Sequence, residues 1–400
     1  MSLDLTNVAA QVLAMISGLK NRRAEQENHL KYALKTIGSP PIDLDALKKK
    51  IKAGSGKTTW LVAGIENGLN ERHTVPGGPA DFTVLAADGS HIDVDRHHST
   101  RCFLINIGSV ALTYGSMPDA QLTSSPCLYS DDKDMLITEP GRGREQPVEG
   151  NILGAKRSVE ECAKLAELAA ALPDKGNALA LLDGTLILWG LDPYPDFVTD
   201  VLLHEGILKH LDTIKKLNHS RNIALASYIS YPRSTDVINV LRITVCPNSV
   251  PDCDEYCPPG KERGCQNLEG VRDRDLFMRL LANGERSALF ISPSKIVKEH
   301  YGDHAVYFFY LKNDDEVARV EVPKWVALDN PLLELTHRLV YDQCKRGQGY
   351  PVALSEAHEQ AVVTGGDREN FWELVESTLT TEHMESGSSL KSVSKRTKWV

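Results

Sequence analysis

The spacing of apolar residues changes near residue 75, which divides the chain into two differently patterned parts. In the first part, Leu5, Val8, Val12 and Leu19 recur at steps that place them on one face of an α-helix. A Ser-Pro-Pro sequence interrupts this pattern, and a lysine-rich second helix follows it. The pattern predicts an N-terminal helical region over residues 1–75, with an apolar stripe suited to packing on a partner or on the rest of the chain.

The second part alternates short apolar runs with longer stretches of helical periodicity. Runs typical of strands lie at residues 82–87, 101–107, 110–114, 178–189, 223–229, 305–311 and 317–322. Helices are predicted at residues 150–172, 195–216, 330–346 and 352–376. Such alternation predicts an α/β fold, in which helices pack on a sheet. The Ser- and Lys-rich residues 377–400 are predicted to form a flexible basic tail.

Composition agrees with a folded protein and narrows the range of functions. Of the 400 residues, 42% are hydrophobic and 25% are charged, as in soluble globular proteins. The formal net charge of −9 argues against unspecific coating of nucleic acid but permits a local basic channel. The chain lacks the run of about 20 apolar residues that a membrane span needs, and its start lacks the basic residues of a signal peptide. A cytoplasmic location is therefore predicted.

The sequence GSGKT at residues 54–58 resembles the end of a phosphate-binding loop. The first glycine of such a loop is expected five residues before Gly56, where this chain has Ile51, and a lysine-rich helical stretch replaces the required strand. ATP binding through Lys57 is therefore a minor hypothesis.

Two apolar runs each lead into an Asp-Gly pair, at Asp88 and at Asp183. A carboxylate in a buried strand needs a hydrogen bond, an ion pair or a cation. Asp-Gly is also a common turn sequence, so either pair taken alone favours a turn. Two such pairs together point to metal ligands at adjacent strand positions.

Two further side chains are predicted to face inward. Helical phase places Glu161 on the apolar stripe of its helix and Glu160 in water, and it places His358 on a stripe with Leu354. Taken alone, such a histidine is usually a core residue. Glu161 has no obvious basic partner on its own stripe, so it is a candidate ligand, with an ion pair to a distant arginine as the alternative. With the two aspartates, Glu161 and His358 form a mixed oxygen and nitrogen set that suits Mn²⁺ or Mg²⁺. Two such ions can support phosphodiester hydrolysis.

Five ordered segments carry a resemblance to a known family. They are the strand with Asp88-Gly89-Ser90, Arg157-x-x-x-Glu161, Leu182-Asp183-Gly184-Thr185-Leu186, Arg319-Val320-Glu321-Val322-Pro323, and Gly349-Tyr350-Pro351 followed by Glu356-Ala357-His358. Together they resemble the NurA family of DNA repair nucleases over about residues 80–375. The ordered set is more specific than any one segment.

The resemblance implies an RNase H-like core with a mixed sheet flanked by helices, in a nuclease domain at residues 76–376. It implies a homodimer whose two active sites face a central channel. It also implies Mn²⁺-dependent DNA cleavage, with 5′ to 3′ exonuclease and single-strand endonuclease activity, and a partner in the hexameric ATPase HerA. We expect this motor to dock on the N-terminal helical region, in DNA end resection or in defence against foreign DNA.

The resemblance also assigns roles to individual residues. Asp88, Glu161, Asp183 and His358 resemble the metal-binding set, and Tyr350 resembles the active-site tyrosine. The phenol of this tyrosine could contact the scissile phosphate or the attacking water.

Two arginines are candidate DNA contacts. Arg233 follows the strand at 223–229, in which family members often carry a lysine that is absent here. Arg319 and Glu321 alternate on a strand and so share a face. An ion pair across the sheet and a contact with DNA are equally open for them.

Four of the eight cysteines, Cys246, Cys253, Cys257 and Cys265, crowd into one proline-rich insertion at residues 246–265. In a reducing compartment such a crowd suggests metal before disulfide bonds, and four thiolates can close a tetrahedral Zn²⁺ site. The spacing lacks the usual paired C-x2-C. Zinc, an iron–sulfur cluster and free thiols therefore all stay open.

A second class of function competes with the nuclease. A catalytically silent RNase H-like dimer could bind DNA or regulate the motor without cutting. The intact acidic set argues for the nuclease, because an adaptor does not need three carboxylates directed to one place.

Overall fold

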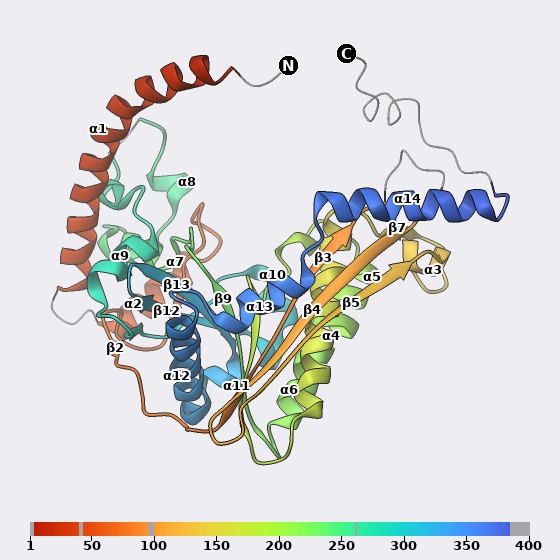
Figure 1. The fold of residues 1–400 in the computed structure, drawn as a ribbon. Helices are drawn as coiled ribbons and strands as arrows, with labels where there is room; N and C mark the ends of the chain where they lie inside the picture. The colour runs from red at the N-terminus through yellow and green to blue at the C-terminus, as the bar shows by residue number, and fades with distance from the viewer. Residues whose placement is uncertain (1–3, 40–42, 95–99, 261, 385–400) are drawn as a thin grey trace. The chain divides into compact units, whose positions relative to one another are not determined.

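The computed structural model describes residues 4–39, 43–94, 100–260 and 262–384 (Figure 1). The chain forms two compact units. The first consists of Met1–Val75, Ile229–Lys298 and Tyr307–Val320, and the second of Pro76–Tyr228, Glu299–Val306 and Glu321–Val400. The nuclease domain predicted at residues 76–376 therefore draws segments from both units. In the part of the chain that is described, no helix has the length and apolarity that crossing a membrane requires.

The first unit begins with the two predicted helices. Helix α1 (Leu5–Ile37) starts at Asp4, whose carboxylate accepts hydrogen bonds from two backbone N–H groups of the first turn. Helix α2 (Leu44–Ala53) follows. The helical prediction is wrong beyond Ala53, because a glycine-containing turn ends α2 and the short strands β1 (Gly64–Ile65) and β2 (Arg72–His73) come next.

The rest of the first unit adds short strands and helices. Its further strands are β10 (Arg286–Ser287), β11 (Phe290–Ile291) and most of β12 (Val306–Asn313) and β13 (Glu316–Pro323). They are hydrogen-bonded in the order β1-β11-β12-β13, and β10 lies beside β12 and β2. Its helices are α7 (Asp236–Val245), α8 (Cys253–Tyr256), α9 (Asp273–Leu280) and most of α10 (Lys295–His300). Apolar side chains from α1, α7, α9 and β12 form its core. Among the described residues, those that α1 contributes to this core belong to its C-terminal half.

The second unit is built on a mixed sheet with long strands (Figure 1). The strands are β3 (Phe82–Ile92), β4 (Phe103–Tyr114), β5 (Asp119–Tyr129), β8 (Asn177–Asp183) and β9 (Asn222–Ile229), in the spatial order β5-β4-β3-β8-β9. Neighbours among β3, β4 and β5 are antiparallel, whereas β8 is parallel to both β3 and β9. This order and direction are RNase H-like, which confirms the predicted α/β fold class.

Helices cover both faces of this sheet. The helices of the unit include α3 (Asp132–Met135), α4 (Asn151–Ala171), α5 (Asp196–Thr199), the π-helix η2 (Asp200–Leu208), α6 (Lys209–Leu217), α11 (Lys324–Ala327), α12 (Asn330–Arg346), α13 (Val352–Ala361) and α14 (Gly365–Thr381). A small hairpin is formed by β6 (Leu136–Thr138) and β7 (Glu145–Pro147). A Cβ atom at Gly89 would lie 2.8 Å from Cγ of Arg157 in α4. A Cβ atom at Gly108 would lie 2.2 Å from the backbone oxygen of Ala357 in α13. Because these glycines face opposite sides of the sheet, α4 and α13 cover opposite faces.

Several predicted strand boundaries differ from the structure. The strand predicted at 82–87 continues to Ile92. The runs at 101–107 and 110–114 form the single strand β4, because Gly108 stays paired with β3 between them. The run at 178–189 stops at Asp183, where Gly184 takes a φ of +83° that turns the chain.

The C-terminal prediction also needs correction. The helix predicted at 352–376 is two helices, α13 and α14, because the residues between them are extended. Helix α14 runs into the first residues of the predicted tail, and residues 385–400 of that tail lie outside the described residues. Strand β5 was not predicted, since nearly all its side chains are exposed and give no apolar run.

Candidate active site

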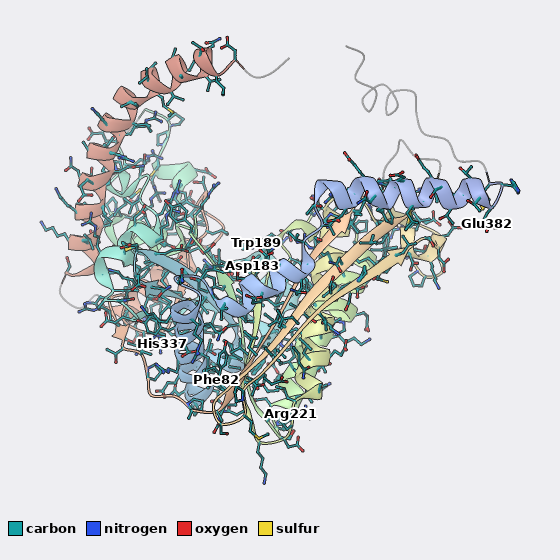
Figure 2. The ribbon with its side chains drawn as sticks, viewed as in Figure 1. Phe82, Asp183, Trp189, Arg221, His337 and Glu382 are labelled. Atoms are coloured by element: carbon teal, nitrogen blue, oxygen red, sulfur yellow. The ribbon has the colours of Figure 1, made fainter. Side chains whose placement is uncertain are left out.

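Two neighbouring parallel strands, β3 and β8, carry Asp88 and Asp183. The last residues paired between the two strands are Ala87 and Leu182. Asp88 directly follows Ala87, and Asp183 directly follows Leu182. This confirms the prediction of adjacent positions. Strand β3 continues through Asp88, where it stays paired with β4. Strand β8 ends at Asp183 (Figure 2). Of the two aspartates, only Asp183 is therefore followed by a turn. Backbone pairing between β3 and β8 stops before the two carboxylates, which leaves an opening between the strands there.

Asp88 faces α13 and contacts His358. The distance between Oδ2 of Asp88 and Nδ1 of His358 is 2.8 Å. The other carboxylate oxygen accepts a hydrogen bond of 2.8 Å from the backbone N–H of Gly89. The His358 side chain is 61% exposed, so the prediction of an inward histidine is wrong. The buried stripe of α13 runs through Leu354 and Ala357 instead, and His358 lies beside it.

Hydrogen bonds hold the end of α13 on the sheet. Asn106 Nδ2 donates to the carbonyl oxygens of Gln360, at 3.1 Å, and Ala361, at 2.9 Å. Ser90 Oγ donates to the Ala361 oxygen as well, and Ser124 Oγ donates to Oδ1 of Asn106 at 3.0 Å. These positioning residues were missed from the sequence. The one available signal was a polar asparagine inside an otherwise apolar strand.

Glu161 approaches the same place from α4, on the other face of the sheet. Its side chain is buried, and its Oε1 lies 3.0 Å from Nε of Arg157, one helical turn earlier. The expectation that Glu161 has no basic partner on its own helix is therefore wrong. Glu160 pairs instead with Lys156 at 3.4 Å, which confirms the predicted helical phase. Burial raises the pKa of Glu161 to about 8; the charge of Arg157 opposes this rise, and the charges of Asp88 and Asp183 add to it.

A tyrosine connects to the second aspartate. The Tyr350 hydroxyl donates a hydrogen bond to the Asp183 carboxylate. Desolvation by the surrounding protein raises the pKa of Asp183, and this hydrogen bond opposes the rise. Burial and the Asp183 charge raise the pKa of Tyr350 well above its usual value, so the phenol stays a donor at neutral pH. The Tyr350 ring packs edge-on against buried Tyr228, with centroids 5.6 Å apart.

Glu321 fixes the turn that follows Asp183. Its Oε2 accepts hydrogen bonds from the Thr185 hydroxyl at 2.8 Å and from the Leu186 backbone N–H at 3.0 Å. Sequence reasoning placed Glu321 on a strand face but missed this role. The buried carboxylate acts as an anchor for the loop, so that Asp183 is held at the end of β8.

All five residues predicted for catalysis thus lie around one opening between β3 and β8: Asp88, Glu161, Asp183, Tyr350 and His358. In the part of the chain that the structure describes, no three His, Cys, Asp or Glu side chains already stand in positions to bind one metal ion. Three carboxylates whose charges disfavour one another are nevertheless a donor set of hard oxygens, which fits Mn²⁺ or Mg²⁺.

A family model confirms the resemblance seen in the sequence. The NurA domain model matches residues 82–363, more than half of the chain. The chain belongs to the NurA family. This is a family of nucleases, hence hydrolases, associated with HerA. No curated protein matches the chain.

The NurA match contains all five candidate catalytic residues and most of the second unit. It also spans the segments of the first unit that follow β9, including the cysteine-rich insertion. Helices α1 and α2 precede the match. The N-terminal helical region is therefore an addition to the part of the chain that the NurA model describes.

The two arginines predicted as DNA contacts differ in their exposure to solvent. Arg233 is exposed, which keeps a DNA contact possible. Arg319 is buried, its Nη1 lies 2.7 Å from Oδ2 of Asp236, and its guanidinium stacks on Phe308 at 3.6 Å. A buried and paired arginine does not reach a phosphate, so the DNA-contact prediction for Arg319 is wrong.

The nucleotide-binding hypothesis gains no support from the fold. The GSGKT segment forms a turn after helix α2, whereas a phosphate-binding loop follows a strand and opens a helix. The ammonium group of Lys57 lies 3.8 Å from the carboxylate of Asp252.

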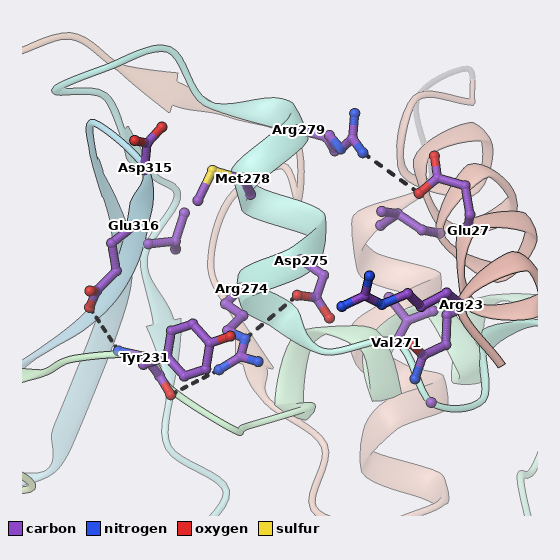
Figure 3. A pocket seen from close by; sticks show the side chains of 14 residues that line it. Arg23, Glu27, Tyr231, Val271, Arg274, Asp275, Met278, Arg279, Asp315 and Glu316 are labelled. Atoms are coloured by element: carbon purple, nitrogen blue, oxygen red, sulfur yellow. Dashed lines mark hydrogen bonds and ion pairs between the residues drawn. The ribbon is translucent and has the colours of Figure 1, made fainter. Parts of the chain in front are cut away.

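The first unit also contains a cavity of about 470 Å³ (Figure 3). The Arg274 guanidinium stacks on the Tyr231 ring at 3.4 Å and donates to the Tyr231 carbonyl oxygen at 3.2 Å. Arg279 pairs with Glu27 at 3.6 Å, and the Tyr231 backbone N–H donates to Glu316 at 2.8 Å. The lining contains three arginines, Arg23, Arg274 and Arg279, and four carboxylates, Glu27, Asp275, Asp315 and Glu316, so the cavity does not form a basic channel.

Proposed function

We propose that this chain is a Mn²⁺-dependent deoxyribonuclease, with 5′ to 3′ exonuclease and single-strand endonuclease activity. It would act as a homodimer with a HerA-like hexameric ATPase in DNA end resection or in defence. The observation that carries the proposal is the gathering of Asp88, Glu161 and Asp183 at the opening between β3 and β8, within the NurA match. An RNase H-like protein without catalysis has no need for this repulsive arrangement.

The three carboxylates would hold the metal, with His358 as the nitrogen donor. Mn²⁺ or Mg²⁺ bound there, as a pair of ions, would supply an activated water and stabilise the leaving oxygen of a phosphodiester. Glu161 must lose its proton and exchange its contact with Arg157 for the metal. Arg157 would then be free to face the negative phosphate, since it already lies at this opening.

The remaining residues orient these groups. Tyr350 keeps its proton and donates it in a hydrogen bond to Asp183, so the phenol can turn toward a phosphate oxygen without carrying charge. Glu321 holds the loop after Asp183. Asn106 and Ser90 hold α13, and so keep His358 beside Asp88. Exposed Arg233 is the proposed contact to the DNA backbone.

The N-terminal half of α1 supports the docking of a partner. Leu5 and Leu13 are each 70% exposed, and Val12 and Ile16 are exposed as well. Apolar residues exposed in this number along one helix are typical of a protein interaction surface. We propose that the motor binds there and supplies the ATP hydrolysis.

DNA cleavage assays test the proposed function directly. The full-length protein is incubated with single- and double-stranded DNA labelled at the 5′ or the 3′ end, with Mn²⁺, with and without a HerA-like motor. We expect cleavage that requires metal, stops with a chelator and shortens duplexes from the 5′ end. Absence of cleavage under all these conditions, with motor binding intact, would contradict the nuclease.

One observation favours the adaptor as the alternative. In the structure Glu161 is paired with Arg157, and Asp88 is in contact with His358, so two of the three carboxylates already have partners. A silent RNase H-like dimer would keep these pairs permanently. It would bind DNA or alter the ATPase rate of the motor equally well with and without Mn²⁺.

Glu161→Gln is expected to lower the Mn²⁺-dependent cleavage rate at least about a hundredfold. Loss of an outer-shell partner already costs a metal site up to about that factor, and Glu161 is proposed to bind the metal directly. Glu160→Gln is the matched control on the adjacent position of α4, and we expect it to keep full activity because Glu160 pairs with Lys156. Initial rates on single-stranded DNA measure both. An inactive Glu160 variant beside an active Glu161 variant would show that helical phase misassigns the ligand.

Binding of Mn²⁺ is expected to release protons at neutral pH. The Glu161 carboxyl holds a proton up to about pH 8 in the metal-free protein, and a metal ligand must be deprotonated. The apparent affinity should therefore rise by about tenfold per pH unit below that pKa and level off above it. Calorimetric titration in two buffers of different ionisation enthalpy counts the protons. Equal proton release from Glu161→Gln would assign the effect to another group.

A further inference from the structure

The four clustered cysteines lie in one part of the first unit, between helices α7 and α9. Cys246 ends α7, and Cys253 and Cys257 begin and follow the single turn of α8. Cys265 directly precedes a short helical turn at Gln266–Leu268. All four are half-buried and none forms a disulfide bond. The candidate active-site residues belong to the other unit.

Backbone contacts bring these cysteines together. The Cys257 N–H donates to the Cys253 carbonyl oxygen at 3.1 Å, so the two thiols belong to one turn. A Cβ atom at Gly264 would lie 3.3 Å from Cδ of Pro247, which places the chain before Cys265 against the chain after Cys246.

Three of the thiols open into a common cavity of about 340 Å³. Cys253, Cys257 and Cys265 line it together with Arg242 and Arg263. Arg242 comes from α7, where its guanidinium lies 5.3 Å from the centre of the Trp60 ring. A tetrahedral site of four thiolates around Zn²⁺ carries a net charge of −2, and two arginines on the same wall would offset it.

The insertion has almost no apolar core of its own, although the Cys253 N–H donates to the Lys57 carbonyl oxygen at 2.9 Å. Between Cys246 and Cys265 the residues are mostly half-buried or exposed, and its only buried residue among those described is Pro251. The helix within it is one turn long. Segments of this kind, with cysteines and prolines but no apolar core, depend on a crosslink or a metal for their order.

We propose that Cys246, Cys253, Cys257 and Cys265 bind one structural Zn²⁺ ion as thiolates. Soft sulfur donors select zinc over the hard cations that suit carboxylates, so this site differs in metal from the carboxylate site of the second unit. The four thiols do not yet stand at bonding positions among the described residues. Binding would require Cys253, Cys257 and Cys265 to rotate within their common cavity and Cys246 to turn toward it, and each thiol would lose its proton to the solvent as the metal binds.

Metal content of the purified full-length protein tests the site. We expect about one zinc per chain, retained through dialysis and lost when Cys253→Ser or Cys257→Ser is introduced. Cys127→Ser is the matched control, because Cys127 is an exposed cysteine of β5 outside the cluster. Zinc that stays bound in both cluster variants, or that is lost equally in the control, would overturn the assignment.

Two measurements on the unmodified protein keep the test valid if a variant fails to fold. Titration of chelator-treated protein with Co²⁺ should produce the charge-transfer absorption of cobalt–thiolate bonds, which oxygen ligands do not give. Alkylation should leave the four cysteines unmodified with Zn²⁺ present and modify them after chelation, as read by peptide mass spectrometry. Alkylation unaffected by Zn²⁺, or disulfide bonds among the four in freshly purified protein, would exclude the zinc site.

Discussion

Replacing Asp183 by asparagine is expected to abolish Mn²⁺-dependent DNA cleavage while leaving the protein folded. Asparagine has the same shape as aspartate and can still accept the hydrogen bond from Tyr350. It lacks the negative charge that a divalent cation requires. The rate should fall by well over a hundredfold, beyond the range for an outer-shell partner, because Asp183 is proposed to bind the metal itself.

The experiment needs a matched control and a second readout. Asp192→Asn removes a carboxylate from an exposed position shortly after Asp183 in the chain, and we expect it to cleave at the normal rate. Gel-shift assays in the presence of a chelator should give both variants the affinity of the unmodified protein for DNA. If Asp183→Asn cut DNA at the normal rate, Asp183 would be excluded from the metal set, and Asp88→Asn would be the next variant to measure.

The part of the site that could be predicted is the part that follows local periodicity. Asp88 and Asp183 each end an apolar run, and strands of that kind lie parallel and adjacent in an α/β sheet. The phase of one helix decided between Glu160 and Glu161, since consecutive helical residues point about 100° apart. Both inferences need only a few neighbouring residues, and the structure agrees with both.

The positioning residues could not be predicted, because their partners lie far away in the sequence. Asn106 contacts Ala361 across 255 positions, and Glu321 contacts Leu186 across 135. Arg319 presented the same problem. Its alternation with Glu321 was correct, but its burial against Asp236 depends on which segments fold into which unit. Periodicity tells which face a side chain takes and not what covers that face.

The division into two units has a consequence for function. Every candidate catalytic residue belongs to the second unit, whereas the exposed stripe of α1 and the cysteine cluster belong to the first. The proposed docking of the motor on α1 and the proposed catalysis can therefore be tested separately. A variant of the α1 stripe should lose the effect of the motor and keep basal cleavage, whereas a variant of Asp183 should lose cleavage and keep motor binding.

Gly108→Ala is expected to destabilise the second unit and to displace His358. The added Cβ atom would lie 2.2 Å from the Ala357 oxygen and 2.4 Å from the Ala361 nitrogen. Because both contacts are with backbone atoms, no side chain can rotate away, and α13 must move off the sheet. We expect a loss of about 3 kcal/mol in the free energy of unfolding, the upper end for overpacking.

Movement of α13 would also reduce cleavage. The hydrogen bonds from Asn106 to the end of this helix would lengthen, and the 2.8 Å contact between His358 and Asp88 would break. Gly154→Ala is the matched control: a Cβ atom there meets nothing within 4 Å, and alanine favours a helix by up to about 1 kcal/mol over glycine. Denaturant unfolding and cleavage rates measure both variants. If Gly108→Ala kept normal stability and rate, α13 would have to be free to shift without cost, and its hydrogen bonds to the sheet would not be what positions His358.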